Sequence, residues 1–358
     1  MKVRPAVAKT GLYAPPLEGR AGGDLLLLDF NESTVPPPPR VLAAINGFLE
    51  AGRARVYPEY QPFLAKLAAY AGVPEQQLIL TNGSDQALDI IVRALVSEGD
   101  EVVFPRPGFA MIPQIAGVHG AKVVSPHYRP DVSFPVDEVL EAVTPRTRLI
   151  ALTSPNNPTG TLVAVGELQA ILERFPDVPV LVDEAYFEYT GLTHVPFLAR
   201  HDNLVITRTF SKAFALAGLR LGYAISNPAF IGELAKVRGP YDVNMLAVAA
   251  ATTLLEQQSE WRGYIEEVMT RAKPMVERFF DEHGVRYFKG CANFMLVEPG
   301  DAADAYEFLK RNRILVRPQR EPIAGTFRLS VGTVADMTRF MGVYSDYLGA
   351  PRAAAQSG

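Results

Sequence analysis

The chain has 358 residues, 48% of them hydrophobic and 21% charged, and its 35 Lys and Arg against 39 Asp and Glu give a formal net charge of −4. This composition predicts a folded globular protein with two domains, or one large domain with an appendage, and excludes a disordered chain. Apolar runs stay far below the roughly 18 residues that a membrane span needs, and no basic stripe predicts binding to nucleic acid. Because the N-terminus has no apolar signal core, we expect a cytoplasmic protein.

Cysteine and histidine are scarce. The single cysteine, Cys291, excludes an intramolecular disulfide and a cysteine-based zinc site. The five histidines are scattered without the spacing of a helical metal site, so we expect no catalytic metal.

Two sections precede residue 245 in the predicted organisation. Residues 1–30, with Pro15-Pro16 and Gly22-Gly23, are expected to form an arm, and residues 31–244 a large domain. Within that domain, β-rich runs alternate with segments of helical period, which predicts an α/β fold with a mostly parallel, doubly wound seven-stranded sheet. The clearest helix is predicted at 85–97, with Ser84 as its cap. The predicted strands are residues 78–80, 101–104, 122–124, 149–153, 180–182, 204–207 and 222–225.

The pattern changes at Pro240. Residues 245 to about 282 are predicted to form one long helix, bent near Pro274 because proline cannot donate a backbone hydrogen bond. Beyond it the pattern predicts a small α+β domain, which with the linking helix makes up residues 245–350, and a flexible tail at 351–358. Its strands and helices are expected at residues 294–297, 302–311, 314–316, 327–331 and 335–348.

Two ionisable residues follow predicted central strands. Lys212 lies among apolar neighbours, and burial lowers the pKa of a lysine toward the neutral amine that a nucleophile requires. Asp183 ends an earlier strand, at the edge where open α/β sheets bind their ligands. Taken alone, the lysine could lie at the surface and the aspartate could cap the next helix.

Three further segments could contribute to the same edge. Residues 154–160 read Ser-Pro-Asn-Asn-Pro-Thr-Gly after a predicted strand, although such residues also build ordinary turns. Residues 81–85, Thr-Asn-Gly-Ser-Asp, lead into the clearest helix, whose free N–H groups could bind a phosphate. Arg220 could offer its guanidinium to that phosphate. No Walker or GxGxxG motif suggests a nucleotide instead.

In combination these segments resemble the fold-type I pyridoxal-phosphate (PLP) aminotransferases, and among them the histidinol-phosphate aminotransferase family. The resemblance covers about residues 26–337, including residues 182–186, 208–223, 238–244, 292–294, 314–317 and 328–333. It implies a PLP cofactor, an amino donor and a 2-oxo acid as substrates, and a homodimer.

Carried over by position, the resemblance assigns the cofactor contacts. Lys212 would be the Schiff-base lysine and the base that moves the substrate proton, and Asp183 would pair with the pyridinium nitrogen. Asn157 and Tyr186 would bind the ring oxygen O3′. The phosphate would be bound by Gly83, Ser84, Asp85, Ser211 and Arg220.

Two aromatic residues belong to the same set. Phe109 stands where the family usually has tyrosine, so it can stack on the cofactor ring without a phenolic hydrogen bond. Tyr57 matches a tyrosine that reaches the cofactor phosphate of the partner subunit, which implies shared sites in a dimer. Packing in the core is the alternative for both side chains.

The resemblance also assigns substrate contacts. Arg328 matches the arginine that receives a substrate carboxylate, and Arg317 one that binds a distal phosphate or carboxylate; surface charges are the alternative. Tyr13 in the arm is a further candidate for the substrate phosphate, and Asn157 also borders the substrate. At the substrate entrance the family's Asn-Glu-Asn-Pro-x-Gly-Pro reads Asn-Glu-Ser-Thr-Val-Pro-Pro at residues 31–37.

The sequence therefore predicts transamination of histidinol phosphate with 2-oxoglutarate, a step of histidine biosynthesis. An aromatic amino-acid aminotransferase and a threonine-phosphate decarboxylase are alternatives on the same scaffold. A non-catalytic PLP-binding protein is a different class, and the presence of both Lys212 and Asp183 argues against it.

Overall fold

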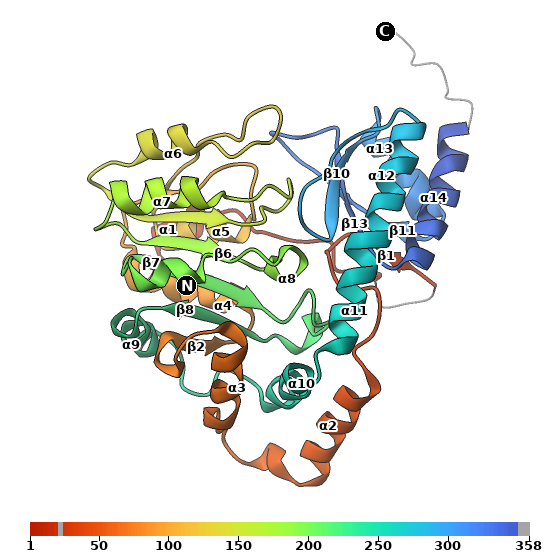
Figure 1. The fold of residues 1–358 in the computed structure, drawn as a ribbon. Helices are drawn as coiled ribbons and strands as arrows, with labels where there is room; N and C mark the ends of the chain where they lie inside the picture. Colours follow the sequence, from red (N-terminus) through yellow and green to blue (C-terminus); the bar gives the residue numbers. More distant parts are fainter. Residues whose placement is uncertain (21–23, 350–358) are drawn as a thin grey trace.

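The computed structural model describes residues 1–20 and 24–349, so the predicted tail at 351–358 lies outside the described residues. A large domain built on a central sheet lies beside a smaller unit formed by the C-terminal part of the described chain, drawn in blue (Figure 1). Over the described ranges, no helix has both the length and the apolar character needed to cross a bilayer.

The large domain has a seven-stranded sheet in the order β2-β8-β7-β6-β5-β3-β4. Its ladders are parallel except those of β8, which runs antiparallel to both β2 and β7. The predicted mostly parallel α/β sheet and all seven predicted strands are thus confirmed. The strands are β2 (Leu78–Thr81), β3 (Glu101–Val103), β4 (Lys122–Val124), β5 (Thr147–Thr153), β6 (Val180–Asp183), β7 (Leu204–Thr209) and β8 (Gly222–Ser226).

Helices cover both faces of this sheet, which is why its central strands are apolar almost without interruption. On one face α4 (Ser84–Leu95), α5 (Met111–Val118) and α9 (Pro228–Val237) form one core with alternate strand residues. The other face forms a second core that continues into the small domain. The helices of the large domain outside the first core are α1 (Pro5–Lys9), α2 (Pro39–Glu50), α3 (Gln61–Ala71), α6 (Val136–Ala142), α7 (Val165–Arg174) and α8 (Phe187–Thr190), and the short 3-10 turns are η1 (Arg53–Arg55), η2 (Glu75–Gln77), η3 (Val195–Ala199) and η4 (Ala217–Leu219).

The prediction of one continuous helix from 245 to 282 is wrong. The chain forms α10 (Met245–Glu256), α11 (Ser259–Glu267), a π-helical segment η5 (Val268–Ala272) and α12 (Lys273–Glu282). Gln257 has extended backbone angles and ends α10. The π-helical segment lies directly before the turn that contains Pro274, whose missing N–H removes one bond of the regular helical ladder.

The small domain combines a four-stranded antiparallel sheet, in the order β12-β13-β10-β9, with two helices, as predicted. Its elements are β9 (Arg286–Phe288), β10 (Phe294–Glu298), α13 (Ala302–Arg311), β11 (Ile314–Leu315), β12 (Arg317–Pro318), β13 (Phe327–Ser330) and α14 (Val334–Gly349).

The N-terminal residues connect the two domains. Near the start, α1 contacts α5, and Gln114 Nε2 donates to the carbonyl of Gly11 at 2.9 Å. Further on, β1 (Leu26–Leu27) pairs in parallel with β11 of the small domain. Sequence pattern did not predict this pairing, and the domain boundaries at 30 and 244 stay a prediction.

Candidate active site

Three predicted catalytic segments meet at the carboxyl edge of the large sheet. In the ladders of β5, β6 and β7, Thr153 lies beside Asp183, and Asp183 beside Thr207. The chain leaves β5 toward Asn157 and leaves β7 toward Lys212. Because neighbouring parallel strands end at one edge, these side chains gather there from distant parts of the sequence.

Lys212 occupies a sheltered position rather than an open surface. Its Nζ donates to the carbonyl of Phe30 at 2.7 Å and lies 5.9 Å from the ring centroid of Tyr186. Burial, and next the charge of Arg328, lower the pKa of Lys212 to about 8. At neutral pH a much larger fraction of Lys212 is therefore the neutral amine than in an exposed lysine.

Asp183 is a buried carboxylate, 5% exposed. Its Oδ1 accepts a hydrogen bond from Thr207 Oγ1 at 2.8 Å, and burial raises its pKa to about 7 despite that bond. It caps no helix, since Tyr186 stands at the N-terminal boundary of α8, so that alternative is wrong. Among residues 1–20 and 24–349, no lysine, arginine or histidine forms an ion pair with it.

Tyr186 is held by Asn31, a residue that the sequence reasoning did not select for the site. Asn31 Nδ2 donates to the phenolic oxygen of Tyr186 at 3.0 Å, and Ser330 Oγ donates to Asn31 Oδ1 at 2.9 Å. Burial raises the pKa of Tyr186, although the nearby charge of Arg328 opposes that shift. The only signal for Asn31 was its place in the segment 31–37, which was assigned to the substrate entrance.

Arg317 and Arg328 lie directly opposite each other on β12 and β13. Arg328 is 7% exposed, so it is not a surface charge; it donates to Asn157 Oδ1 and, at 2.5 Å, to the carbonyl of Asp29. Its Nε is buried without a partner, and burial lowers its pKa. Like charges that face each other across strands destabilise a sheet, and Tyr13 is close enough to act on Arg328. The cluster offers cationic donors that an anionic ligand could accept.

A second group for an anion forms where α4 begins. Gly83 precedes the helix with φ +77°, and a Cβ there would lie 2.3 Å from Arg220 Nη2. Arg220 donates to Ser211 Oγ at 3.2 Å and to Asp85 Oδ2 at 3.0 Å. The first helical N–H groups, from Ser84 on, have no intrahelical acceptor. Gly83, not Ser84, is the cap residue, which corrects that prediction.

The structure thus brings Gly83, Ser84, Ser211 and Arg220 together, and it suggests a different part for Asp85. A carboxylate repels an anion, so Asp85 is not suited to contact a phosphate. Its ion pair with Arg220 instead orients the guanidinium.

The two predicted aromatic contacts differ in placement. Phe109 is half-buried against the core of α4 and α5, and the preceding Pro107 carbonyl accepts from Asn156 Nδ2 at 3.0 Å. Tyr57 lies outside the cluster, 78% exposed and with its ring centroid 4.5 Å from that of Tyr241. Core packing is therefore wrong for Tyr57.

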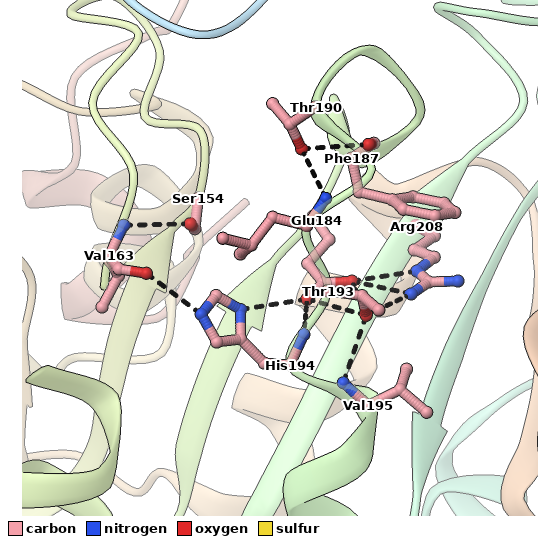
Figure 2. Close-up of polar contacts among 10 residues, drawn as sticks. Ser154, Val163, Glu184, Phe187, Thr190, Thr193, His194, Val195 and Arg208 are labelled. Carbon is pink, nitrogen blue, oxygen red and sulfur yellow. Dashed lines mark hydrogen bonds and ion pairs between the residues drawn. The ribbon is translucent and has the colours of Figure 1, made fainter. Parts of the chain in front are cut away.

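A buried network of hydrogen bonds and ion pairs connects the ends of the neighbouring strands (Figure 2). Glu184 accepts from Arg208 Nη2 at 2.8 Å and from the backbone N–H of His194 at 2.6 Å. His194 Nε2 lies 3.1 Å from the carbonyl of Val163, whose N–H donates to Ser154 Oγ. Burial disfavours the ionised form of Glu184, but the hydrogen bond from His194 and the charge of Arg208 outweigh it and lower its pKa.

This network joins the end of β5 to β6 and β7, and thereby fixes the spacing of the segments that carry Asn157, Asp183 and Lys212. Sequence reasoning missed it because isolated charged residues in a strand or loop read as surface positions. The available signals were the matching segments 182–186 and 208–223, which contain Glu184 and Arg208.

Comparisons with known proteins agree with this arrangement. Residues 23–343 match the family model described as aminotransferase class I and II. Histidinol-phosphate aminotransferase 1 of Nitrosococcus oceani is 36% identical over 330 residues, covering 89% of this chain and 87% of the relative. Histidinol-phosphate aminotransferase of Caldanaerobacter subterraneus is 32% identical over 311 residues, with 86% and 88% covered. The crystal structure of histidinol-phosphate aminotransferase from Sinorhizobium meliloti in complex with pyridoxal-5'-phosphate superposes with a TM-score of 0.87 at 25% identity, covering 97% of this chain and 98% of that one.

Proposed function

The chain belongs to the aminotransferase class I and II family, and from this premise we propose that it binds PLP and transfers the amino group of histidinol phosphate to 2-oxoglutarate. The observation that carries the proposal is that Lys212 and Asp183 meet at one sheet edge, near the start of α4 with Arg220 and near the arginine pair of β12 and β13.

The residues present fit PLP at three points. Asp183 is a buried carboxylate that lacks a cationic partner among the described residues, as a pyridinium nitrogen would require. Gly83 leaves room beside Arg220 that any side chain would fill, next to free N–H groups of a helix start, as a phosphate would require. Lys212 supplies an amine of lowered pKa. When bound, PLP supplies an acceptor for the electrons released as the substrate Cα–H bond breaks.

The protein's own groups then have defined tasks. Asp183 stabilises positive charge in a low-dielectric site, and Thr207 holds its carboxylate in place through the 2.8 Å bond. With the cofactor bound, the Lys212 amine would take the proton from the substrate Cα and deliver it to the cofactor carbon C4′, because only a neutral amine can act as that base. Asn31 fixes the orientation of the Tyr186 hydroxyl.

The arginine pair supports an anionic donor and an anionic acceptor. Histidinol phosphate carries one phosphate, and 2-oxoglutarate carries two carboxylates, so a single cluster of Arg317, Arg328 and Tyr13 can serve both half-reactions. Charge-assisted hydrogen bonds contribute roughly 1.5–3 kcal/mol each. An apolar side chain in that position would leave these donors unpaired, which penalises aromatic amino acids.

We predict that kcat/KM for histidinol phosphate exceeds that for phenylalanine or tyrosine by at least about 100-fold, the discrimination expected from two lost charge-assisted bonds. Initial rates with 2-oxoglutarate as acceptor measure this for each donor. A higher value for either aromatic acid would reassign the protein to the aromatic aminotransferases. Stoichiometric carbon dioxide from phosphothreonine would reassign it to the decarboxylases.

The proposal includes a homodimer in the cytoplasm and needs no nucleic-acid or membrane partner. Apolar side chains are exposed on α2 and after it, at Leu42, Leu49 and Val56, close in sequence to the exposed Tyr57. A second copy of the chain would cover such a surface and place Tyr57 at the neighbouring cofactor phosphate. In Figure 1 this part of the chain lies at the periphery of the large domain.

Mixing two inactive variants tests the shared site. We expect subunits with Tyr57→Ala to recover activity when exchanged with Lys212→Ala subunits, because one site of the mixed dimer then carries both lesions and the other carries none. The recovered rate per dimer should approach about half that of the wild type. Exchange is verified by native mass spectrometry. Confirmed exchange without recovery would place Tyr57 in its own subunit's site.

A further inference from the structure

Arg20, in the N-terminal residues, binds two carboxylates at once. Its guanidinium donates to Asp29 from Nε at 3.2 Å and from Nη2 at 3.0 Å, and it also forms an ion pair with Glu32. The arginine side chain is only 12% exposed and its Cζ lies 4.4 Å from the ring centroid of Phe30. Of these residues only Glu32 lies in a segment that the sequence analysis selected, the substrate entrance at residues 31–37.

The segment that Arg20 binds is also in contact with the candidate active site. The carbonyl of Asp29 accepts from Arg328, and the carbonyl of Phe30 accepts from Lys212. Arg317 also lies over the ring of Phe30, with its Cζ 5.1 Å from the centroid. The segment 29–32 therefore contacts the proposed base and both proposed anion-binding arginines through its backbone and its aromatic ring.

The acidic side chains of this segment, Asp29 and Glu32, place negative charge beside the groups that are proposed to bind anions. The charge of Asp29 acts on Arg328, and the charge of Glu32 acts on Lys212. The formal charge of this group is 3 − 2 = +1, from the three arginines Arg20, Arg317 and Arg328 and the two carboxylates Asp29 and Glu32. Without Arg20 the formal charge is 2 − 2 = 0. Two unpaired carboxylates would then repel an incoming anion and compete for the arginines that should bind it.

We propose that Arg20 is a specificity-determining positioning residue, which holds Asp29 and Glu32 so that Arg317 and Arg328 stay available for the anionic groups of the substrates. The inference rests on the proposed function in that those two arginines bind substrate anions. It assigns to the N-terminal arm a residue that acts on affinity through the acidic pair, without touching the substrate.

The chemistry of the contact explains why an arginine is needed. A guanidinium offers several donors in a planar fork and can stack on an aromatic ring, so it can satisfy two carboxylates and Phe30 together. A lysine would keep the charge but offers a single point of contact. Arg20→Lys should therefore retain only part of the effect.

The decisive experiment measures maleate, a dicarboxylate probe, binding to the PLP-loaded protein by isothermal titration calorimetry. Arg20→Met is expected to weaken maleate binding by about tenfold, because the unpaired carboxylates of Asp29 and Glu32 then repel the ligand from several ångströms away. The KM values for 2-oxoglutarate and histidinol phosphate should rise in parallel, with kcat changed less than twofold. The matched control is Arg286→Met, which removes an arginine from the exposed ion pair with Glu298 in the small domain and should leave binding unchanged.

A second variant separates charge from structure. In Arg20→Met/Glu32→Gln one of the two unpaired carboxylates is neutral, so maleate affinity should return to within about threefold of the wild type. If Arg20 only holds the arm in place, the double variant binds no better than Arg20→Met, and that result overturns the inference. Unchanged maleate affinity in Arg20→Met overturns it as well.

These outcomes are separate from the fate of the proposed function. Maleate binding does not depend on the amino donor, so failure of histidinol phosphate as a substrate would leave the inference on Arg20 standing. Absence of maleate binding by the wild type would overturn the inference on Arg20, whereas the proposed function is decided by the kinetics with histidinol phosphate. Wild-type KM values in an Arg20→Met enzyme that still transaminates histidinol phosphate would overturn the inference alone.

Discussion

Replacing Lys212 by alanine is expected to lower the transamination rate by at least about 10⁴-fold, the upper range that one positioned acid–base group contributes. The side chain is the one amine beside Asp183 and Tyr186 at the sheet edge, among the described residues. Single-turnover kinetics with saturating PLP would measure the loss. A variant that reacts within tenfold of the wild-type rate would show that another group moves the proton.

A labelling experiment on the wild type supplies an internal control. Lys273 is also buried, donates to the carbonyls of Gly290 and Ala292, and has its pKa lowered by burial to about 8, as Lys212 does. Reduction with borohydride followed by peptide mass analysis should attach the cofactor to Lys212 and leave Lys273 unmodified. Attachment at Lys273 would mean that a lowered pKa, and not placement beside Asp183, decides which lysine reacts.

The change Asp183→Asn is expected to keep PLP bound and lower the rate of proton abstraction by about 10³-fold. The amide oxygen can still accept the bond from Thr207, while the negative charge is lost. A charge pair at about 4 Å is worth roughly 4 kcal/mol at an effective dielectric constant of 20, which corresponds to about three decades in rate. Rapid-mixing measurements of a single half-reaction would detect it.

Thr207→Val is the matched control for that prediction. It removes the hydrogen bond to Asp183 but leaves the carboxylate charge in place, so a loss of about tenfold or less is expected from one hydrogen bond. Equal losses in Asp183→Asn and Thr207→Val would mean that orientation of the carboxylate, rather than its charge, governs the reaction.

Local pattern in the sequence determined the sheet and its ligand-binding edge. Buried parallel strands need apolar residues on both faces, so the runs at β5, β6 and β7 could be recognised without a structure. Since parallel strands end at a common edge, residues just beyond those runs had to lie together, and Asp183 and Lys212 followed from that rule. The same local rules failed in the helical stretch from 245 to 282, where an extended residue and a π-helical segment interrupt the pattern.

Only the tertiary structure decided which distant residues complete the site. Asn31 meets Tyr186 across 155 positions of sequence, and Arg328 meets the carbonyl of Asp29 across 299. Such pairs leave no periodic signal, because hydrophobic spacing records which face of an element is buried and not what lies against it. The buried Glu184 and Arg208 were hidden for the same reason: a charge can be buried only when its partner is in place, and the fold alone brings that partner.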